Sequence, residues 1–390
     1  MTAVDIKEIM AAVCRVVPGP AALHEPVFAG NEWVYVKECL DTGWVSTAGS
    51  FVDRFESELA QITGASHVIA TNTGTSALHA ALLIAGIGPG DEVLIPGLSF
   101  VATANAVAHT GATAHFVDVE TTSLGIDPDA LATYLGQIGE RDGAELRNTK
   151  TGRLIKAIVC VHVFGHPARI KKLREIADAY GLSLIEDAAE SLGSTYDGLH
   201  TGTFGHLGII SFNGNKTITT GAGGAILTDD DDLAAALRRI TTTAKLPHPW
   251  LYDHDAIAYN YRLPNINAAL GCAQLELLPG FIDSKRRLAQ AYIEAFKDVA
   301  GVSVLAEPAG ARSNYWLNAL VLDTPDCEKR DALLTDANAA GIGMRPAWKP
   351  LHTLGMYAEN PRADLSVTEA MYERLVNLPS GPGLIPAEHA

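Results

Sequence analysis

The chain has 390 residues, of which 47% are apolar and 19% charged, a composition that supports a large core and excludes a disordered chain. Lys and Arg number 29 against 45 Asp and Glu, and this net charge of −16 argues against nucleic acid and anionic membranes as partners. There is no run of about 18 apolar residues and no signal-peptide pattern, so we expect no membrane span. Five cysteines without a Cys-x-x-Cys pair indicate reduced thiols and a cytoplasmic location.

Short apolar runs alternate with helical patterns from about residue 56 to residue 230. The expected strands are 67–70, 92–96, 114–119, 157–164, 182–187, 207–212 and 223–229, and the expected helices between them are 76–87, 101–111 and 169–181. Strands rich in Val and Ile that alternate with helices are typical of a parallel sheet covered on both faces. The fold class predicted for this region is α/β, in the doubly wound style.

The pattern changes after the first two thirds of the chain. Residues 267–299 are expected to form one long helix or a bent pair broken at Pro279-Gly280, followed by strands at 302–307 and 315–322 and a helix at 327–341. This order suits a small α+β domain. We therefore predict an irregular N-terminal clasp (1–48), a large domain (49–275) with a mainly parallel sheet, and a small C-terminal domain (276–390).

Candidate site residues follow three of the expected strands, where open α/β sheets bind ligands. Residues 73–76 (Thr-Gly-Thr-Ser) open a helix, so they suit a phosphate or form an ordinary N-cap. Asp187 ends an apolar strand, and Lys216 lies just beyond another, away from any solvated charged face. Lysine can form a Schiff base, aspartate can hold a pyridinium nitrogen protonated, and Phe100 can cover a flat ring. Together these residues indicate pyridoxal phosphate.

Three near-motifs point elsewhere and are set aside. The glycine-rich run 221–224 precedes a strand rather than a helix, and 214–217 lacks the adjacent Gly-Lys of a phosphate-binding loop. His162 and His166 have the four-residue spacing of helical metal ligands, but Gly165 and Pro167 break any helix there. We expect structural histidines and no metal site.

From about Gly30 to Ser380 the chain resembles the DegT/StrS-type nucleotide-sugar aminotransferases, which depend on pyridoxal phosphate and have fold type I. The motifs that carry the resemblance are TNTGTSALHAAL (71–82), PGLSFVATANAV (96–107), IEDAAESLGS (185–194), SFNGNKTITTGAGG (211–224) and YNYRLPNINAALG (259–271). Several motifs in the right order are more specific than any one of them. The runs FNGNK, TTTAKLPHPW (241–250) and YNYRLPN are closer still to the LegC-type enzymes of bacillosamine and legionaminic acid synthesis.

The resemblance implies a role for each matching residue. Lys216 matches the Schiff-base lysine, Asp187 the partner of the pyridinium nitrogen, and Phe100 the residue that stacks on the ring. The phosphate cradle is matched by Gly74, Thr75 and Ser211. Asn260 matches an asparagine that reaches the cofactor phosphate of the neighbouring subunit, which implies a homodimer with shared active sites. Contacts with the substrate are expected from Trp44, Arg262 and His352.

One cofactor-binding position departs from the common pattern. Many members have Gln where this chain has Glu190, so a carboxylate replaces the amide that bonds the hydroxyl of the cofactor ring. The LegC-type subgroup also has Glu there. Glu190 can bond that hydroxyl through a proton, or contact the sugar instead.

The reaction implied is transfer of an amino group from L-glutamate, released as 2-oxoglutarate, to the C4 ketone of a nucleotide-linked 4-keto-6-deoxy sugar. The subgroup suggests UDP-2-acetamido-2,6-dideoxy-4-hexulose, although no motif identifies the nucleotide. A 3-keto sugar and a non-catalytic regulatory protein that holds pyridoxal phosphate remain alternatives. Related sugar dehydratases have His in place of the lysine, so Lys216 argues against that activity.

Overall fold

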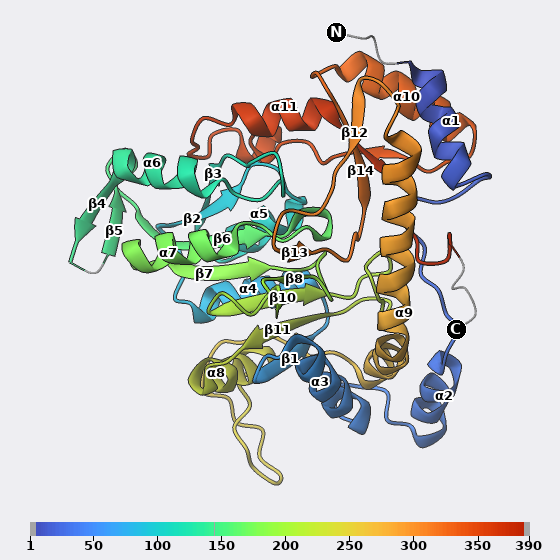
Figure 1. The fold of residues 1–390 in the computed structure, drawn as a ribbon. Helices are drawn as coiled ribbons and strands as arrows, with labels where there is room; N and C mark the ends of the chain where they lie inside the picture. Colours follow the sequence, from blue (N-terminus) through green and yellow to red (C-terminus); the bar gives the residue numbers. More distant parts are fainter. Residues whose placement is uncertain (1–4, 144, 386–390) are drawn as a thin grey trace.

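Two larger β-sheets joined by one long helix make up the fold of residues 5–143 and 145–385, which the computed structural model describes (Figure 1). The helices are α1 (Ile6–Val16), α2 (Glu32–Thr42), α3 (Ser50–Thr63), α4 (Gly74–Ile84), α5 (Val101–His109), α6 (Pro128–Ile138), α7 (Ile170–Tyr180), α8 (Asp231–Thr241), α9 (Asn265–Phe296), α10 (Cys327–Ala339) and α11 (Ser366–Arg374), with 3₁₀ turns at Val163–Gly165, Leu351–Thr353 and Gly355–Tyr357. The strands are β1 (His67–Thr71), β2 (Asp91–Pro96), β3 (Thr113–Val117), β4 (Gly139–Asp142), β5 (Glu145–Asn148), β6 (Leu154–Val161), β7 (Ser183–Asp187), β8 (Thr195–Tyr196), β9 (Leu199–His200), β10 (Leu207–Ser211), β11 (Gly224–Thr228), β12 (Val302–Val304), β13 (Ala311–Arg312), β14 (Asn318–Leu322), β15 (Arg345–Pro346) and β16 (Leu375–Leu378).

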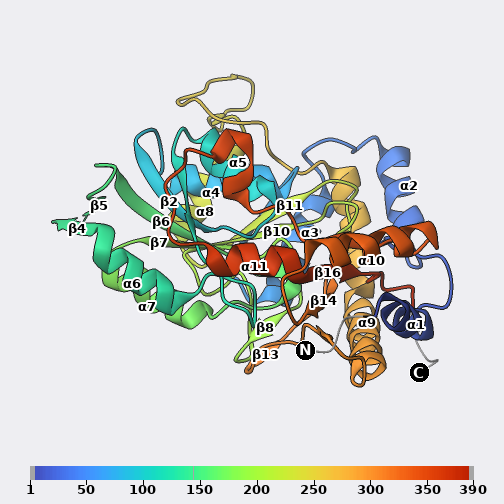
Figure 2. The same ribbon diagram turned by 90° about the horizontal axis from the view of Figure 1, so that it is seen from above.

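The large sheet has the order β1-β11-β10-β7-β6-β2-β3, with the β4–β5 hairpin attached to β6. Strands β10, β7, β6, β2 and β3 are parallel, whereas β11 is antiparallel to both of its neighbours, β1 and β10. The hairpin projects at the end of the sheet far from α9 in both views (Figures 1 and 2). The predicted α/β class with a mainly parallel central sheet is confirmed. The pairs β1–β11 and β10–β11 on one side of the sheet, and β4–β5 and β5–β6 on the other, are antiparallel.

Alternation along the strands explains why helices cover both faces of this sheet. Ile69 and Ile209 point to one face, where α4, α5 and α8 pack, while Val68 and Ile210 point to the other face against α3 and α9. Farther along the sheet, Leu94 packs against α6 and α7 on that second face. Because side chains of a strand alternate with a period of two, a strand covered on both sides reads as a continuous apolar run.

Helix α9 links the two sheets and continues through Pro279. Of the two alternatives, the single long helix is confirmed, and the bent pair broken at Pro279-Gly280 is wrong. A proline inside a helix costs about 3 kcal/mol because one backbone hydrogen bond is lost. Pro279 lies on the exposed side of α9, whereas Leu278, Phe281 and Ile282 pack into the core. This packing on both sides of the proline holds the helix together.

The small sheet has the order β12-β14-β16-β15, is antiparallel, and packs with α10, α11 and the far end of α9. The N-terminal segment is not irregular as expected, because it contains α1 and α2. Ile9 and Val13 of α1 are buried in the core of the small domain, and α2 packs on α9. The first 48 residues therefore contact both ends of α9. Among the described residues, no helix has both the length and the apolar character required to cross a bilayer.

Two buried histidines predict a loss of stability in acid. Burial lowers the pKa of both His166 and His200 to about 4. Since the unfolded chain binds these protons below about pH 6.5, stability present above that pH is lost as the pH falls towards 4, by about 1.4 kcal/mol per pH unit for each histidine. Urea unfolding between pH 7.5 and 4.5 gives the free energy of unfolding as a function of pH. The slope of this dependence should be smaller for His166→Gln than for the wild type, by the equivalent of one proton. Identical slopes would contradict the lowered pKa of His166 in the folded protein.

Candidate active site

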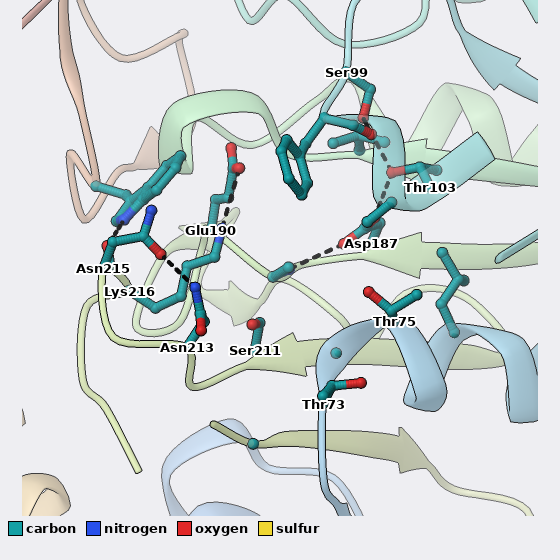
Figure 3. Close-up of a pocket in the computed structure, with 18 of the residues that line it drawn as sticks. Thr73, Thr75, Ser99, Thr103, Asp187, Glu190, Ser211, Asn213, Asn215 and Lys216 are labelled. Atoms are coloured by element: carbon teal, nitrogen blue, oxygen red, sulfur yellow. Dashed lines mark hydrogen bonds and ion pairs between the residues drawn. The ribbon is translucent and has the colours of Figure 1, made fainter. Parts of the chain in front are cut away.

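Three strand ends meet at one edge of the large sheet. Strands β1 and β10 run in the same direction because both are antiparallel to β11, and Ile226 of β11 pairs with Ile69 on one side and Ile209 on the other. Parallel pairing of β10 with β7 adds the carboxyl end of β7 to the same edge. A cavity of about 270 Å³ opens there, near the lower end of the volumes usual for small-molecule sites (Figure 3).

Asp187 is the last residue of β7 and lines this cavity. Its Oδ2 accepts a hydrogen bond from the Thr103 hydroxyl at 2.8 Å, and the Thr103 hydroxyl lies 3.0 Å from that of Ser99 (Figure 3). Burial raises the pKa of Asp187 above its usual value, against the hydrogen bond from Thr103 and the charge of Lys216. A cation at this carboxylate would compensate for the cost of burying it.

Lys216 reaches the cavity from the loop after β10. Its Nζ lies 3.3 Å from Oε1 of Glu190 and 4.0 Å from the centre of the Trp316 ring (Figure 3). The other oxygen of Glu190 accepts the Phe164 N–H at 2.9 Å, and burial raises the pKa of this carboxyl group. The amine is therefore held between a carboxylate and an aromatic face, in a place from which most water is excluded.

The amino end of α4 forms the floor of the cavity. Thr73 caps this helix by accepting the Ser76 N–H, and Gly74 and Thr75 begin it. Backbone N–H groups in a first helical turn have no acceptor within the helix and favour an anion. A Cβ built on Gly74 would lie 2.9 Å from Cβ of Ser211, so the glycine keeps open a space that a side chain would fill.

Aromatic rings form the wall opposite the sheet. Phe100 is the residue before α5, its side chain is half exposed, and its ring centre lies 6.3 Å from that of Trp348. Trp348 and Trp316 come from the small domain and also line the cavity. A flat ligand that enters above Asp187 can therefore contact Phe100.

Comparison with known proteins decides the family. The profile of the DegT/DnrJ/EryC1/StrS aminotransferase family matches residues 28–390. GDP-perosamine synthase of Vibrio cholerae is 38% identical over 367 residues, which cover 93% of this chain and 94% of that protein. The chain belongs to this aminotransferase family.

Two further relatives agree with this assignment. EpsN of Bacillus subtilis, named as a pyridoxal phosphate-dependent aminotransferase, is 36% identical over 93% of this chain and 91% of its own length. The crystal structure of DesI, described with its TDP-sugar product, superposes with a TM-score of 0.78 at 30% identity and covers 93% of this chain and 90% of that chain. The protein is thus a pyridoxal phosphate-dependent aminotransferase with fold type I, as the sequence resemblance implied.

The residues present in the aminotransferase site suit this cofactor. An open helix terminus beside Gly74 matches a phosphate, the buried carboxylate of Asp187 matches a protonated ring nitrogen, and the amine of Lys216 matches an aldehyde. The structure brings seven residues predicted from the sequence to one cavity: Gly74, Thr75, Phe100, Asp187, Glu190, Ser211 and Lys216. Their individual roles stay predictions.

The space beside Gly74 gives a direct test of the phosphate cradle. In Gly74→Ala the new methyl group must displace Ser211, and overpacking of this kind costs about 1–3 kcal/mol. We expect the affinity for pyridoxal phosphate to fall about tenfold, since 1.4 kcal/mol corresponds to a factor of ten. Titration of cofactor-free enzyme measures this loss. Gly136→Ala is the matched control, because Gly136 lies in α6 with nothing within 4 Å of an added Cβ.

Four other predicted residues lie outside the cavity of the single chain. Trp44 is 60% exposed, and Asn260 is also exposed. The guanidinium of Arg262 pairs with Glu56 at 2.9 Å, and Nε2 of His352 lies 3.0 Å from Oε1 of Glu369. The structure therefore does not bring these four side chains to Lys216 within one chain.

Three contributors were missed by the sequence analysis. Thr103 lies one helical turn after Phe100, so the spacing of a hydroxyl at i+3 was an available signal. Trp316 and Trp348 lie about 100 residues or more beyond Lys216 in the chain, and no local pattern links them to the site. His162 is buried against Glu186, with 2.9 Å between Nε2 and Oε2, and its Nδ1 accepts the Ala168 N–H. That histidine has the structural contacts expected for it.

Proposed function

We propose that the enzyme transfers an amino group from L-glutamate to the C4 ketone of a nucleotide-linked 4-keto-6-deoxy sugar, with UDP-2-acetamido-2,6-dideoxy-4-hexulose as the preferred substrate. The product is the corresponding 4-amino-4,6-dideoxy sugar. The observation that carries this proposal is the convergence of the Lys216 amine, the Asp187 carboxylate and the open helix terminus at Gly74 on one cavity. The similarity to GDP-perosamine synthase, whose product is a 4-amino sugar, supports position C4.

Pyridoxal phosphate, when bound, supplies an aldehyde that captures amines and a ring that accepts electrons from the substrate carbon. Gly74, Thr75 and Ser211 would bind its phosphate, and Phe100 would cover one face of its ring. Asp187 would hold the ring nitrogen protonated, because a buried carboxylate strongly favours a cation beside it. Thr103 orients that carboxylate through its hydrogen bond of 2.8 Å.

Lys216 has two tasks in this proposal. Its amine would hold the cofactor through the aldehyde and, when free, would take a proton from the substrate carbon and return it. Glu190, whose Oε1 lies 3.3 Å from the Lys216 amine, accepts a hydrogen bond from it and keeps the amine directed into the cavity. The indole of Trp316 covers the amine from the other side and keeps water away.

The nucleotide is the least constrained part of the proposal. Among the relatives compared above, one has GDP in its name and the structure of another is described with a TDP-sugar, so members of the family differ at this point. The choice of UDP rests on the resemblance of 212–216, 241–250 and 259–265 to the LegC-type enzymes. A 3-keto sugar is the second candidate, because no residue in the cavity distinguishes the two carbonyl positions.

A panel of substrates tests the proposal. The purified enzyme, loaded with pyridoxal phosphate and glutamate, is incubated with 4-keto and 3-keto sugars linked to UDP, GDP and dTDP, and amino sugars are detected by mass spectrometry. We expect conversion of the UDP-linked 4-keto-6-deoxy sugar. Conversion of 3-keto sugars alone would overturn position C4, and a bound cofactor without turnover of any sugar would favour the regulatory alternative.

We also propose a homodimer in which Asn260 serves the neighbouring site. Several aromatic side chains of the chain are unusually exposed: Trp33 is 76%, Trp250 75% and Tyr252 80% exposed. Trp250 and Tyr252 lie on the long loop after α8, which projects from the body of the molecule (Figure 1). A large exposed apolar surface in a monomer is typical of a subunit interface.

Mixing two impaired variants tests shared sites. If Asn260 acts across the dimer, a mixed dimer of Lys216→Ala and Asn260→Ala has one site with both substitutions and one with neither. Unfolding and refolding the variants together should therefore restore activity that neither shows alone. No recovery in a preparation shown to contain mixed dimers would place Asn260 in its own subunit's site or in no site.

A further inference from the structure

A second lysine lies behind the active site and takes no part in the proposed reaction. Lys285, in the middle of α9, is completely buried. Its Nζ lies 3.1 Å from the carbonyl oxygen of Trp316, within hydrogen-bond reach of the carbonyl oxygen of Ser380, and 3.1 Å from Nε2 of His24. When it is protonated, the amine has three hydrogens, and three acceptors from three distant chain segments lie within reach of them.

The Trp316 contact leads directly to the catalytic lysine. The indole ring of Trp316 lies 4.0 Å from Nζ of Lys216. The indole N–H donates to the carbonyl of Asn215 at 2.7 Å, and the backbone N–H donates to Oδ1 of Asn314 at 2.8 Å. With the carbonyl bonded to Lys285, every polar group of Trp316 is held, and each bond bears on the orientation of its ring.

The backbone at this point needs to be held. Tyr315, the residue before Trp316, has a φ of +48°, in the left-handed region that bulky side chains rarely adopt. Such a conformation is strained and persists only where the surroundings impose it. Without the bond from Lys285, the peptide after Tyr315 can relax and carry the indole away from Lys216.

The lowered pKa of His24 is consistent with its role as an acceptor in this arrangement. Burial, followed by the charges of Lys285 and Lys216, lowers the pKa of His24 to about 2, and burial lowers the pKa of Lys285 to about 7. A neutral His24 accepts a hydrogen bond from the Lys285 amine through Nε2. The proton of the imidazole ring is then on Nδ1, which is buried without a hydrogen-bond partner among the described residues. His24 thereby completes the set of acceptors around the amine.

We propose that Lys285, assisted by His24, is a positioning residue that fixes the peptide at residues 315–316 so that the Trp316 indole covers the Lys216 amine. The proposal rests on the assigned role of Lys216 in amino transfer. It also gives the N-terminal segment a function, since His24 connects it to the active site through α9.

The alternative is that Lys285 only ties three segments together, and a matched variant separates the two. Tyr292 is buried two turns further along α9, and its hydroxyl donates to the carbonyl of Pro379 at 3.0 Å, next to Ser380. Tyr292→Phe therefore removes a buried bond between the same helix and the same segment without touching Trp316. Both Lys285→Met and Tyr292→Phe should lower the stability of the protein. Only Lys285→Met should change the surroundings of the Lys216 amine.

The test uses cofactor-free enzyme and competitive acetylation followed by mass spectrometry. In Lys285→Met we expect Lys216 to be acetylated several-fold faster than in the wild type. We also expect the pH dependence of this acetylation rate to shift. Tyr292→Phe should leave the rate and the pH dependence of Lys216 acetylation unchanged. Lys297, whose side chain is 56% exposed, should be acetylated at the same rate in every protein. If Lys285→Met does not fold, His24→Leu, which removes one acceptor only, should give the same change to a smaller extent.

Turnover supplies the second readout. Misplacement of the amine in Lys285→Met should lower kcat by about 10- to 100-fold while KM for the sugar changes little. Unchanged labelling of Lys216 in a folded variant would overturn the positioning proposal, whatever the loss of stability. If Lys216→Ala keeps full activity, the proposed reaction fails instead, and the labelling result still stands on its own.

Discussion

Lys216→Ala is expected to abolish amino transfer, with a loss of at least about 10⁴-fold in kcat, because one substitution removes both the attachment point and the proton carrier. Borohydride treatment followed by peptide mass spectrometry should link the cofactor to Lys216 in the wild type and to no lysine in the variant. Amino-sugar formation from glutamate measures the loss of turnover.

Lys216→Arg is the informative companion. Arginine keeps a positive charge opposite Glu190 and beside Trp316, but its guanidinium stays protonated in proteins and cannot attack an aldehyde. It should be as inactive as the alanine variant, whereas Lys297→Ala on the surface should be fully active. Substantial turnover by Lys216→Arg would mean that only the charge matters.

Asp187→Asn is expected to lower kcat by about 10²–10³-fold, the usual loss when one preorganised electrostatic group is removed from an active site. Asparagine has the same size and can still accept the hydrogen bond from Thr103, but it has no charge to hold a proton on the ring nitrogen. Steady-state kinetics and cofactor titration together separate slower chemistry from weaker binding.

Thr103→Val provides a graded control for the Asp187 substitution. It leaves the carboxylate in place and removes only the donor that lies 2.8 Å from it. We expect a smaller loss in kcat than in Asp187→Asn, with cofactor affinity nearly unchanged. If Asp187→Asn turns over like the wild type, the buried carboxylate has a structural role and another group must stabilise the cofactor ring.

The sequence predicted the central part of the site well because that part follows from local patterns. Apolar runs located the strands that end at Thr71, Asp187 and Ser211, and ligands of open α/β sheets bind beyond such ends. Polar residues that directly follow those runs were therefore expected to meet. The cavity contains them, together with Phe100 at the start of α5.

The elements that were predicted wrongly or missed show where local patterns are insufficient. Helix α1 has an Asp5 N-cap and buried Ile9 and Val13 at helical spacing, a signal that the label of an irregular clasp overlooked. Helix α2 buries only Glu32 and Cys39, so its sequence has little periodicity and its position depends on packing against α9. A helix break at Pro279 was considered because local sequence does not show the core residues that pack on both sides of it. This tertiary packing holds the helix together.

By itself the sequence determined the fold class, the residues at the strand ends and the acidic net charge of the chain. Only the tertiary structure decided that Trp316 covers Lys216, that Glu190 contacts the same amine and that Arg262 pairs with Glu56 rather than reaching the cavity of its own chain. The physical reason is that periodicity along a strand or helix specifies which face a side chain occupies. Its partner is specified by packing between segments that lie up to about 200 residues apart.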